Sequence, residues 1–473
     1  MRPREQRETG QTDMFRSRLD QIIDLNHPQA RLARTVDWGF LEGTFGAAYS
    51  DVGGQPPLPT RLMAGLAILK YMHNLSDEVL CERWVENPYF QYFCGEEFFQ
   101  HRLPFDRSSI TRWRQRMGED RLGALVQESL SVATRTKAVK PADLTEVVVD
   151  TTVQPKAITF PTDAKLAHRA REILVRMARK YGIDLRQSYK RVGKLALIKH
   201  QRYAHAKQFN RAAKMLRKLR TYLGRVMRDI VRRIRGNKEL VDRFARVLSL
   251  ASRVRRQKRR QLGPKVYSMH APEVECIGKG KAHAPYEFGV KVSVTTTLKR
   301  SRGGQFIVHA KALPGNPYDG HTLADVIPAM EAQNGGVIGR VVADAGYRGH
   351  NAPMPLRVYT TNQKRGVTPE IKRAFKRRAA VEPVIGHAKN EHRMGRNYLK
   401  GRVGDAINAV MAAVGYNFRL LIRWLRLLLR LILAEVLNIR LQEPRRRLRV
   451  IICEIFGTEC HNAGHQTRFS YGR

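Results

Sequence analysis

The stretch TEVVVDTTV at 145–153, together with GRVVADAGY at 339–347, decides the fold of this chain. Both stretches are short, apolar and rich in β-branched residues, so they predict buried strands. Asp150 follows VVV in the first, and Asp344 follows VVA in the second. A carboxylate that closes a buried strand lies at the edge of a sheet, where open α/β sheets bind ligands. The alternative is that each Asp only forms a turn or caps a helix.

Outward from these strands, the period of the apolar residues changes along the chain. Alternating patterns at 286–298 and 305–313, and an apolar run at 356–361, predict further strands. HTLADVIPAMEAQ at 321–333 predicts a helix, and helical spacing returns from about 369 to 440. This order indicates an α/β fold in which helices flank a mixed sheet.

Residues 1–135 have the pattern of a helical domain. Apolar positions recur at helical spacing in RLMAGLAILKYMHNL (61–75), and Ser76 is a suitable N-cap for the next helix. A further helix is predicted in LPFDRSSITRWRQRM (103–117). We expect this domain to bind DNA and to read its sequence, although arginines on helices also commonly contact only phosphates or solvent. The candidate contacts are Arg112, Arg114 and Arg116.

The charge of the chain demands a polyanionic partner. Its 473 residues include 86 Lys and Arg against 42 Asp and Glu, a formal net charge of +44. Residues 161–260 alone hold 32 Lys and Arg against 6 Asp and Glu, a net +26, while apolar residues still recur every three or four positions. That pattern predicts helices with a basic face, which is either solvated or bound to nucleic-acid phosphates. The candidate phosphate contacts are Arg217, Lys218, Arg232, Arg233, Arg255 and Arg256.

Other features limit the class of protein. The five cysteines are scattered without a C-x-x-C pair, so no disulfide framework is implied and a reducing cytoplasm fits. The apolar stretch 419–440 is interrupted by Arg423, Arg426 and Arg430 on one helix face, so an amphipathic helix is favoured over a membrane span. We expect it to pack on the protein or on a partner subunit, the alternative being a membrane surface. Residues 441–473 are expected to form a basic tail.

A third acid, Glu382, lies in RRAAVEPVIGHAKNEH (377–392), which we interpret as one helix. On one helix, Arg378, Glu382 and Lys389 would face the same side. Two-metal phosphoryl transfer needs carboxylates around two ions about 3.5–4 Å apart, and Mg²⁺ prefers carboxylate oxygens, water and phosphate. The sequence therefore predicts two Mg²⁺ ions, which Mn²⁺ can replace, on Asp150, Asp344 and Glu382. Alone, Glu382 would be an ordinary acid on a helix surface.

Four separated motifs resemble those of bacterial insertion-sequence transposases, and most closely the insertion-sequence-five family. They are DTTVQPKAITFPTDAKL (150–166), PEVECIGKGKAHAPYEFGVKVSV (272–294), GNPYDGHTL (315–323) and ADAGYRG (343–349). The segment 58–117 is also similar to that family's helical domain. The family spaces its third acid as Tyr, two residues, Arg, three residues, Glu, six residues, Lys. Arg378, Glu382 and Lys389 fit, and Phe375 stands at the Tyr position.

The resemblance implies a ribonuclease-H-like catalytic domain at 140–440, interrupted by a basic helical insertion at 161–262. It implies that Asp150, Asp344 and Glu382 form a D-D-E triad, with Arg378 and Lys389 holding DNA phosphates. The expected function is that of a DDE transposase, which binds terminal inverted repeats and catalyses metal-dependent cleavage and strand transfer. Two element ends must be held together, so at least a homodimer on DNA is expected, in the bacterial cytoplasm on the nucleoid.

Two other functions stay open. The tail from 441 departs from the family pattern, which favours a DNA-binding protein without catalysis. An RNA-processing nuclease with the same fold is a third hypothesis, although no RNA-binding module is recognisable. The GNPYDGHTL motif is interpreted as a structural turn before the helix at 321–333. Its polar members are Asn316, Tyr318, Asp319 and His321.

Overall fold

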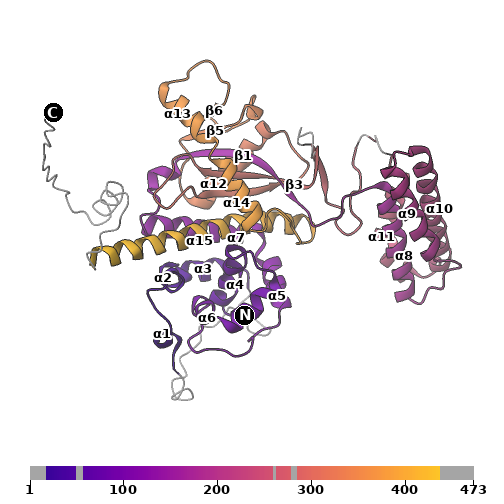
Figure 1. Cartoon of the computed structure of the whole chain (residues 1–473), viewed down its shortest axis with the longest axis horizontal. Coiled ribbons are helices and arrows are strands. Elements are labelled where there is room, and N and C mark those ends of the chain that lie inside the picture. The colour runs from indigo at the N-terminus through magenta and orange to yellow at the C-terminus, as the bar shows by residue number, and fades with distance from the viewer. Residues whose placement is uncertain (1–16, 50–56, 259–260, 262, 279–284, 437–473) are drawn as a thin grey trace, which may run out of the picture.

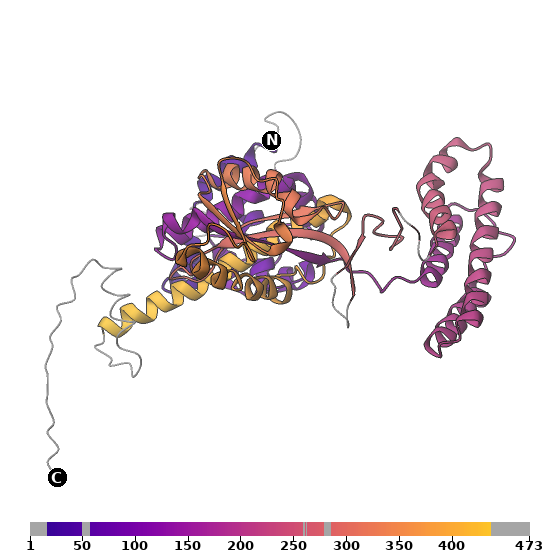
Figure 2. The ribbon, with the colours of Figure 1, turned by 90° about the horizontal axis from the view of Figure 1, so that it is seen from above.

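The computed structural model describes residues 17–49, 57–258, 261, 263–278 and 285–436. It consists of a large body, in which helices surround a mixed sheet, and a unit of four helices that lies apart from it in both views (Figures 1 and 2). The predicted tail at 441–473, with Cys453 and Cys460, lies outside the described residues. The described cysteines, Cys81, Cys94 and Cys276, are free thiols.

Within the described residues, seven helices precede the sheet, where the sequence predicts a helical segment. Ser76 caps α5, since its hydroxyl oxygen accepts a hydrogen bond from the Val79 amide at 3.2 Å. The 28-residue α7 contains a kink at Gly118, whose φ of 67° lies outside the helical region. The helices are α1 (Leu19–Ile22), α2 (Pro28–Thr35), α3 (Trp38–Gly46), α4 (Thr60–Met72), α5 (Asp77–Glu86), α6 (Pro88–Phe93) and α7 (Ser108–Arg135).

In the part of the chain that the structure describes, six strands form one mixed sheet, and each predicted strand is confirmed. The order runs β4-β3-β1-β5-β6, with β2 beside the first part of β3. β1 pairs antiparallel with β3 and parallel with β5, and β5 pairs parallel with β6. This mixed topology is compatible with a ribonuclease-H-like core. The strands are β1 (Glu146–Pro155), β2 (Glu275–Gly278), β3 (Tyr286–Thr297), β4 (Ile307–Leu313), β5 (Arg340–Ala343) and β6 (Arg357–Thr360).

Short turns and longer helices connect and cover these strands. The predicted helix at 321–333 is α12 (Leu323–Asn334), and it lies between β4 and β5 in the chain. After β6 come α13 (Pro369–Arg378), α14 (Val381–Glu391) and α15 (Gly401–Val436). Three short 3-10 helices complete the set among the described residues: η1 (Pro141–Leu144), η2 (Asp319–Thr322) and η3 (Ala345–Tyr347).

The prediction of one helix at 377–392 is wrong, because the chain turns between α13 and α14. The amide of Glu382 bonds to the carbonyl of Ala379, three residues back, instead of continuing the i to i−4 pattern. Pro383 is the physical reason: it has no N–H for the Ala379 carbonyl, and its ring clashes with the preceding turn. Arg378 and Glu382 are therefore not one helical turn apart.

The long helix α15 joins the N-terminal helices to the sheet. It packs against α7, α4 and β4, and its Leu421 and Trp424 belong to the same buried cluster as Val149 of β1. Its arginines at 423, 426 and 430 are exposed, so the described part of the predicted amphipathic helix packs on the protein itself. In the part of the chain that is described, no helix is long and apolar enough to cross a membrane.

The described residues of the basic segment form four helices with a core of their own. Leu174, Leu223, Phe244 and Val254 come from three different helices and meet in this core. The helices are α8 (Asp163–Lys180), α9 (Lys190–His205), α10 (Phe209–Ile234) and α11 (Lys238–Arg256). They leave the sheet after β1 and return before β2, so the four-helix unit is inserted within the sheet's own sequence (Figure 1).

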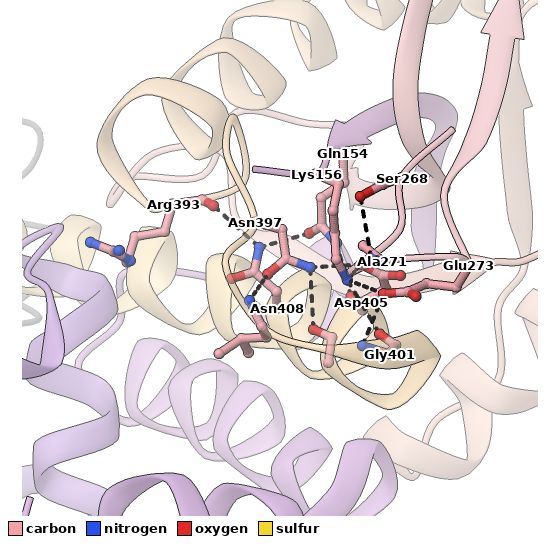
Figure 3. Close-up of polar contacts among 12 residues, drawn as sticks. Gln154, Lys156, Ser268, Ala271, Glu273, Arg393, Asn397, Gly401, Asp405 and Asn408 are labelled. Carbon is pink, nitrogen blue, oxygen red and sulfur yellow. Dashed lines mark hydrogen bonds and ion pairs between the residues drawn. The ribbon is translucent and has the colours of Figure 1, made fainter. Parts of the chain in front are cut away.

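A buried polar network ties both ends of this four-helix unit to α15 (Figure 3). Lys156, just after β1, places its Nζ 2.8 Å from Asp405 Oδ1 of α15 and 2.9 Å from Glu273 Oε1 of the returning segment. Gln154 donates to the Asp405 carbonyl at 2.9 Å, and Asn397 donates to the Asp405 carboxylate at 2.7 Å. Since these side chains are at most 10% exposed, the network stabilises one arrangement of the three segments.

Candidate active site

Asp150 and Asp344 meet because of strand register. The parallel pairing of β1 with β5 ends at the pair Val149 and Ala343, and the two aspartates are the next residues along the chain, Asp150 within β1 and Asp344 just after β5. The sequence suggested that Asp150 closes its strand, but β1 continues to Pro155, and in this last part it pairs with β3 alone. Asp150 therefore lies in mid-strand, at the point where its neighbour β5 stops and leaves that side of β1 open.

Arg378 bridges the two carboxylates. Its Nη2 lies 3.2 Å from Asp150 Oδ2 and 3.3 Å from Asp344 Oδ2. The Asp150 side chain is 16% exposed, whereas that of Asp344 is 49% exposed. Burial raises the pKa of Asp150 above its usual value, and the Arg378 guanidinium opposes that rise. One cation thus compensates two acids at the sheet edge.

The residues around the pair orient it. Asp344 Oδ1 accepts hydrogen bonds from the Ala345 amide at 2.5 Å and from the Thr361 hydroxyl at 3.1 Å. The hydrogen bond from the Ala345 amide makes Asp344 the N-cap of η3, so the alternative interpretation of Asp344 as a helix cap is correct. The second oxygen of Asp344 faces Arg378, so capping and a role in the site do not exclude each other.

The GNPYDGHTL motif lies beside the pair, and sequence reasoning missed this. Asp319 Oδ1 accepts hydrogen bonds from the Thr151 hydroxyl at 3.0 Å and from Lys291 Nζ at 2.9 Å. Asp319 also begins η2 before α12, as expected for a turn. The phenol of buried Tyr347 lies in the field of the acids, and burial raises its pKa well above the usual value. Nothing in the linear spacing indicates that Thr151 and Asp319 touch.

Glu382 lies in the first turn of α14 with an exposed side chain. Its neighbour Val381 is fully buried against Val148 and Val342, which precede the two aspartates by two residues each. Within the described residues, no three His, Cys, Asp or Glu side chains are grouped closely enough to hold a metal ion. The structure thus assembles the aspartate pair, and it places Glu382 next to the strands without closing a triad.

Lys389 lies elsewhere. Its Nζ is 3.9 Å from Glu287 Oε2, near the start of β3. Val294 is the residue of β3 opposite Asp150. At about 3.3 Å per residue, the distance along β3 from Glu287 to Val294 is about 23 Å. Of the two predicted basic residues, the structure brings only Arg378 to the aspartates.

The aspartate pair has the chemistry to hold a divalent cation. Carboxylate oxygens are the ligands that Mg²⁺ prefers, and it commonly takes only one or two of them together with water and phosphate. Asp150 Oδ2 and Asp344 Oδ2 already converge on one positively charged group, the Arg378 guanidinium. A divalent cation that displaced the Arg378 guanidinium, or bound beside it, would lie between the two carboxylates.

The three arginines of α7 differ in their surroundings. Arg114 is buried, and it donates two hydrogen bonds of 2.9 Å to Asp77, so it presents no face to DNA. Arg112 is exposed and donates to the Ser108 hydroxyl, and the exposed Arg116 lies over the ring of Tyr49. Arg112 and Arg116 therefore remain the candidate DNA contacts of α7.

The predicted basic residues of the four-helix unit are all exposed. Arg232 and Arg233 lie 3.5 Å and 3.7 Å from the Asp229 carboxylate. The others show no carboxylate partner among the described ion pairs. The exposed set is Arg217, Lys218, Arg232, Arg233, Arg255 and Arg256.

Comparison with known proteins agrees with this architecture. Residues 17–116 match the family "Transposase domain (DUF772)", and residues 268–418 match "Transposase DDE domain". The first match covers the helices up to the start of α7, and the second covers the sheet from just before β2 into α15, including Asp344 and Glu382. This chain therefore belongs to the DDE transposases of insertion sequences, enzymes that cut and transfer DNA strands and generally use divalent metal ions.

One curated relative is similar over much of its own length. It is "Uncharacterized protein ORF8 in nfe locus" from Rhizobium meliloti, 51% identical over 201 residues, which are 42% of this chain and 97% of that protein. No solved structure matches the chain significantly.

Proposed function

We propose that the chain is the transposase of an insertion sequence of the insertion-sequence-five family, which binds terminal inverted repeats and catalyses cleavage and strand transfer. The observation that carries this proposal is the pairing of Asp150 and Asp344 through Arg378 at the open edge of β1. The four sequence motifs and the excess of basic residues support DNA as the substrate.

The two aspartates supply the ligands of the site. Asp150 and Asp344 would hold divalent cations through their Oδ2 atoms, and a bound ion would supply a nucleophile and stabilise charge on the transferred phosphate. The aspartates fit this role because both belong to rigid segments, the middle of β1 and the cap of η3. Their hydrogen bonds to Thr151, Ala345 and Thr361 orient the carboxylates before substrate binds.

Glu382 is the proposed third ligand, held near the site by its neighbour in the chain. Val381 packs on Val148 and Val342, so the first turn of α14 cannot move away from the strands without exposing this cluster. Arg378 ends α13 and faces both aspartates, where its guanidinium can also bind a DNA phosphate in a bidentate manner. We infer two ions, Mg²⁺ by preference, and at least two protomers on DNA.

The test is cleavage of a labelled duplex that carries the inverted repeats flanking the element. The experiment compares the wild-type protein with Asp150→Asn, Asp344→Asn and Glu382→Gln, in Mg²⁺, in Mn²⁺ and in EDTA. Glu370→Gln is the matched control, because Glu370 is an exposed acid of α13 paired with Arg340 away from the aspartates.

We expect nicking at the element ends that needs metal, survives Glu370→Gln and is lost in the other three variants. Cleavage that persists in Asp344→Asn would show that the site is assigned wrongly. Tight binding of the duplex with no cleavage in any divalent ion would leave a DNA-binding protein without catalysis.

A further inference from the structure

The inserted four-helix unit contains a basic hollow that the transposase families do not cover. Residues 117–267 lie outside both family matches. Within them, a hollow of about 200 Å³ lies between α10 and the segment that precedes α9. Four arginines line it, together with one acid: Arg186, Arg225, Arg228, Arg232 and Asp229.

The hollow is built by specific contacts rather than by loose surface chains. Buried Asp229 accepts a hydrogen bond from the Arg186 amide at 2.8 Å, which fixes the segment before α9 against α10. Tyr189, in the left-handed region with φ 54°, stacks on Tyr222 of α10 with ring centroids 4.8 Å apart. The Arg225 guanidinium donates to the Tyr189 hydroxyl at 3.4 Å. These contacts position the arginines before any ligand binds.

The charge in the hollow is uncompensated. Among the described residues that line the hollow, Asp229 is the single acid against four arginines, and Arg232 Nη2 lies 3.5 Å from it. Guanidinium groups that converge without enough carboxylates are suited to phosphate, which accepts several charge-assisted hydrogen bonds at once.

The basic surface continues along α10 beyond the hollow. A second hollow beside it is lined by Arg225 again and by Lys214, Arg217 and Lys218. From Lys214 to Arg232 the basic side chains recur at helical spacing over about 27 Å, at about 1.5 Å per residue. This length matches about eight base pairs of DNA at about 3.4 Å each.

We propose that this face of α10 binds the phosphate backbone of duplex DNA, with one phosphate seated in the four-arginine hollow. The proposal rests on the proposed function, since it takes DNA as the substrate. It adds that the inserted helices hold DNA outside the catalytic sheet, in a manner independent of base sequence. Contacts to phosphate position a protein on DNA without reading its sequence.

The test measures binding of a random-sequence 30-base-pair duplex by the full chain at several salt concentrations. The variant Arg225→Ala/Arg228→Ala removes two charges from the hollow. Arg246→Ala/Arg253→Ala is the matched control, because both arginines are exposed on α11 and line neither hollow. Arg225→Lys/Arg228→Lys keeps the charge. Circular dichroism and thermal melting check that each variant retains the helices.

We expect the slope of log affinity against log salt to become shallower by about 1 in the first variant, since the loss of one phosphate contact removes about 0.9. The control and the lysine variant should keep the wild-type slope. Equal slopes for all the variants, or an equal loss in the control, would overturn the proposal. Binding to vesicles of anionic lipid that depends on Arg225 and Arg228, with duplex binding unchanged, would also overturn it.

The outcome is separable from that of the cleavage experiment. If the protein never cleaves DNA but the slope is reduced in Arg225→Ala/Arg228→Ala, the phosphate-binding site is supported and the transposase activity is contradicted. If the protein cleaves DNA but the slope is unchanged in Arg225→Ala/Arg228→Ala, the transposase activity is supported and the phosphate-binding site is contradicted.

Discussion

Replacing Lys156 by Met should destabilise the protein strongly. The Lys156 side chain is 5% exposed, and its ammonium group lies between the carboxylates of Asp405 and Glu273, which are 6% and 10% exposed. Burial raises the pKa of Asp405, and the ion pair with Lys156 opposes this rise. Burial also acts on Glu273, but hydrogen bonds from Lys156 and from backbone amides keep its pKa below the usual value.

Methionine has a similar volume, so packing changes little and the loss of charge dominates. Two buried carboxylates would then face each other without a cation, and removal of one partner from a buried ion pair costs about 3–5 kcal/mol. The control is Lys299→Met, because Lys299 is 61% exposed and pairs with Glu146 at 3.2 Å. An exposed pair of that kind contributes about 0–1 kcal/mol.

The assay is urea unfolding at neutral pH, followed by circular dichroism, with the free energy of unfolding compared among the variants. The triple variant Lys156→Met/Glu273→Gln/Asp405→Asn should recover much of the lost stability, because it leaves no buried charge. If Lys156→Met and Lys299→Met were equally stable within about 1 kcal/mol, the buried network would not fix the ends of the four-helix unit as we argue.

Three further outcomes are expected. Arg114→Ala should lower the free energy of unfolding by about 3 kcal/mol or more, because Asp77 would lose a bidentate partner that is 4% exposed. The control Arg112→Ala, at an exposed position, should change the free energy of unfolding by about 0.5 kcal/mol or less. Equal urea midpoints for the two variants would contradict this. Burial raises the pKa of Glu96 to about 7, above the ordinary value of 4.5. The wild type should therefore lose stability relative to Glu96→Gln as the pH rises from 4.5 to 7, with no further change above pH 7. A difference in thermal melting that stays constant across this pH range would refute the prediction. Phe244→Ala, in the core of the four-helix unit, should cost about 3–5 kcal/mol, and hydrogen exchange should accelerate in α8, α10 and α11 but not in β1 or β5.

The secondary structure and the first two acids could be predicted from local pattern alone. Runs such as VVVD and VVAD have no stable alternative to a buried strand, because their β-branched side chains disfavour helix and need a core. The basic helices could also be predicted, since their apolar residues keep the helical period through a net charge of +26. The break between α13 and α14 was predictable too, because Pro383 was visible in the sequence and its effect on the preceding turn is local.

The composition of the site depended on contacts between residues far apart in the chain. The sequence by itself determined the strands, the amphipathic helices and the positions of Asp150 and Asp344, because these follow from the character of neighbouring side chains. Only the tertiary structure decided that Arg378 bridges the aspartates, that Asp319 contacts Thr151, that Arg114 is buried on Asp77 and that Lys389 lies near Glu287. Each of these depends on strand register and helix packing, which are set by the whole core rather than by any one segment.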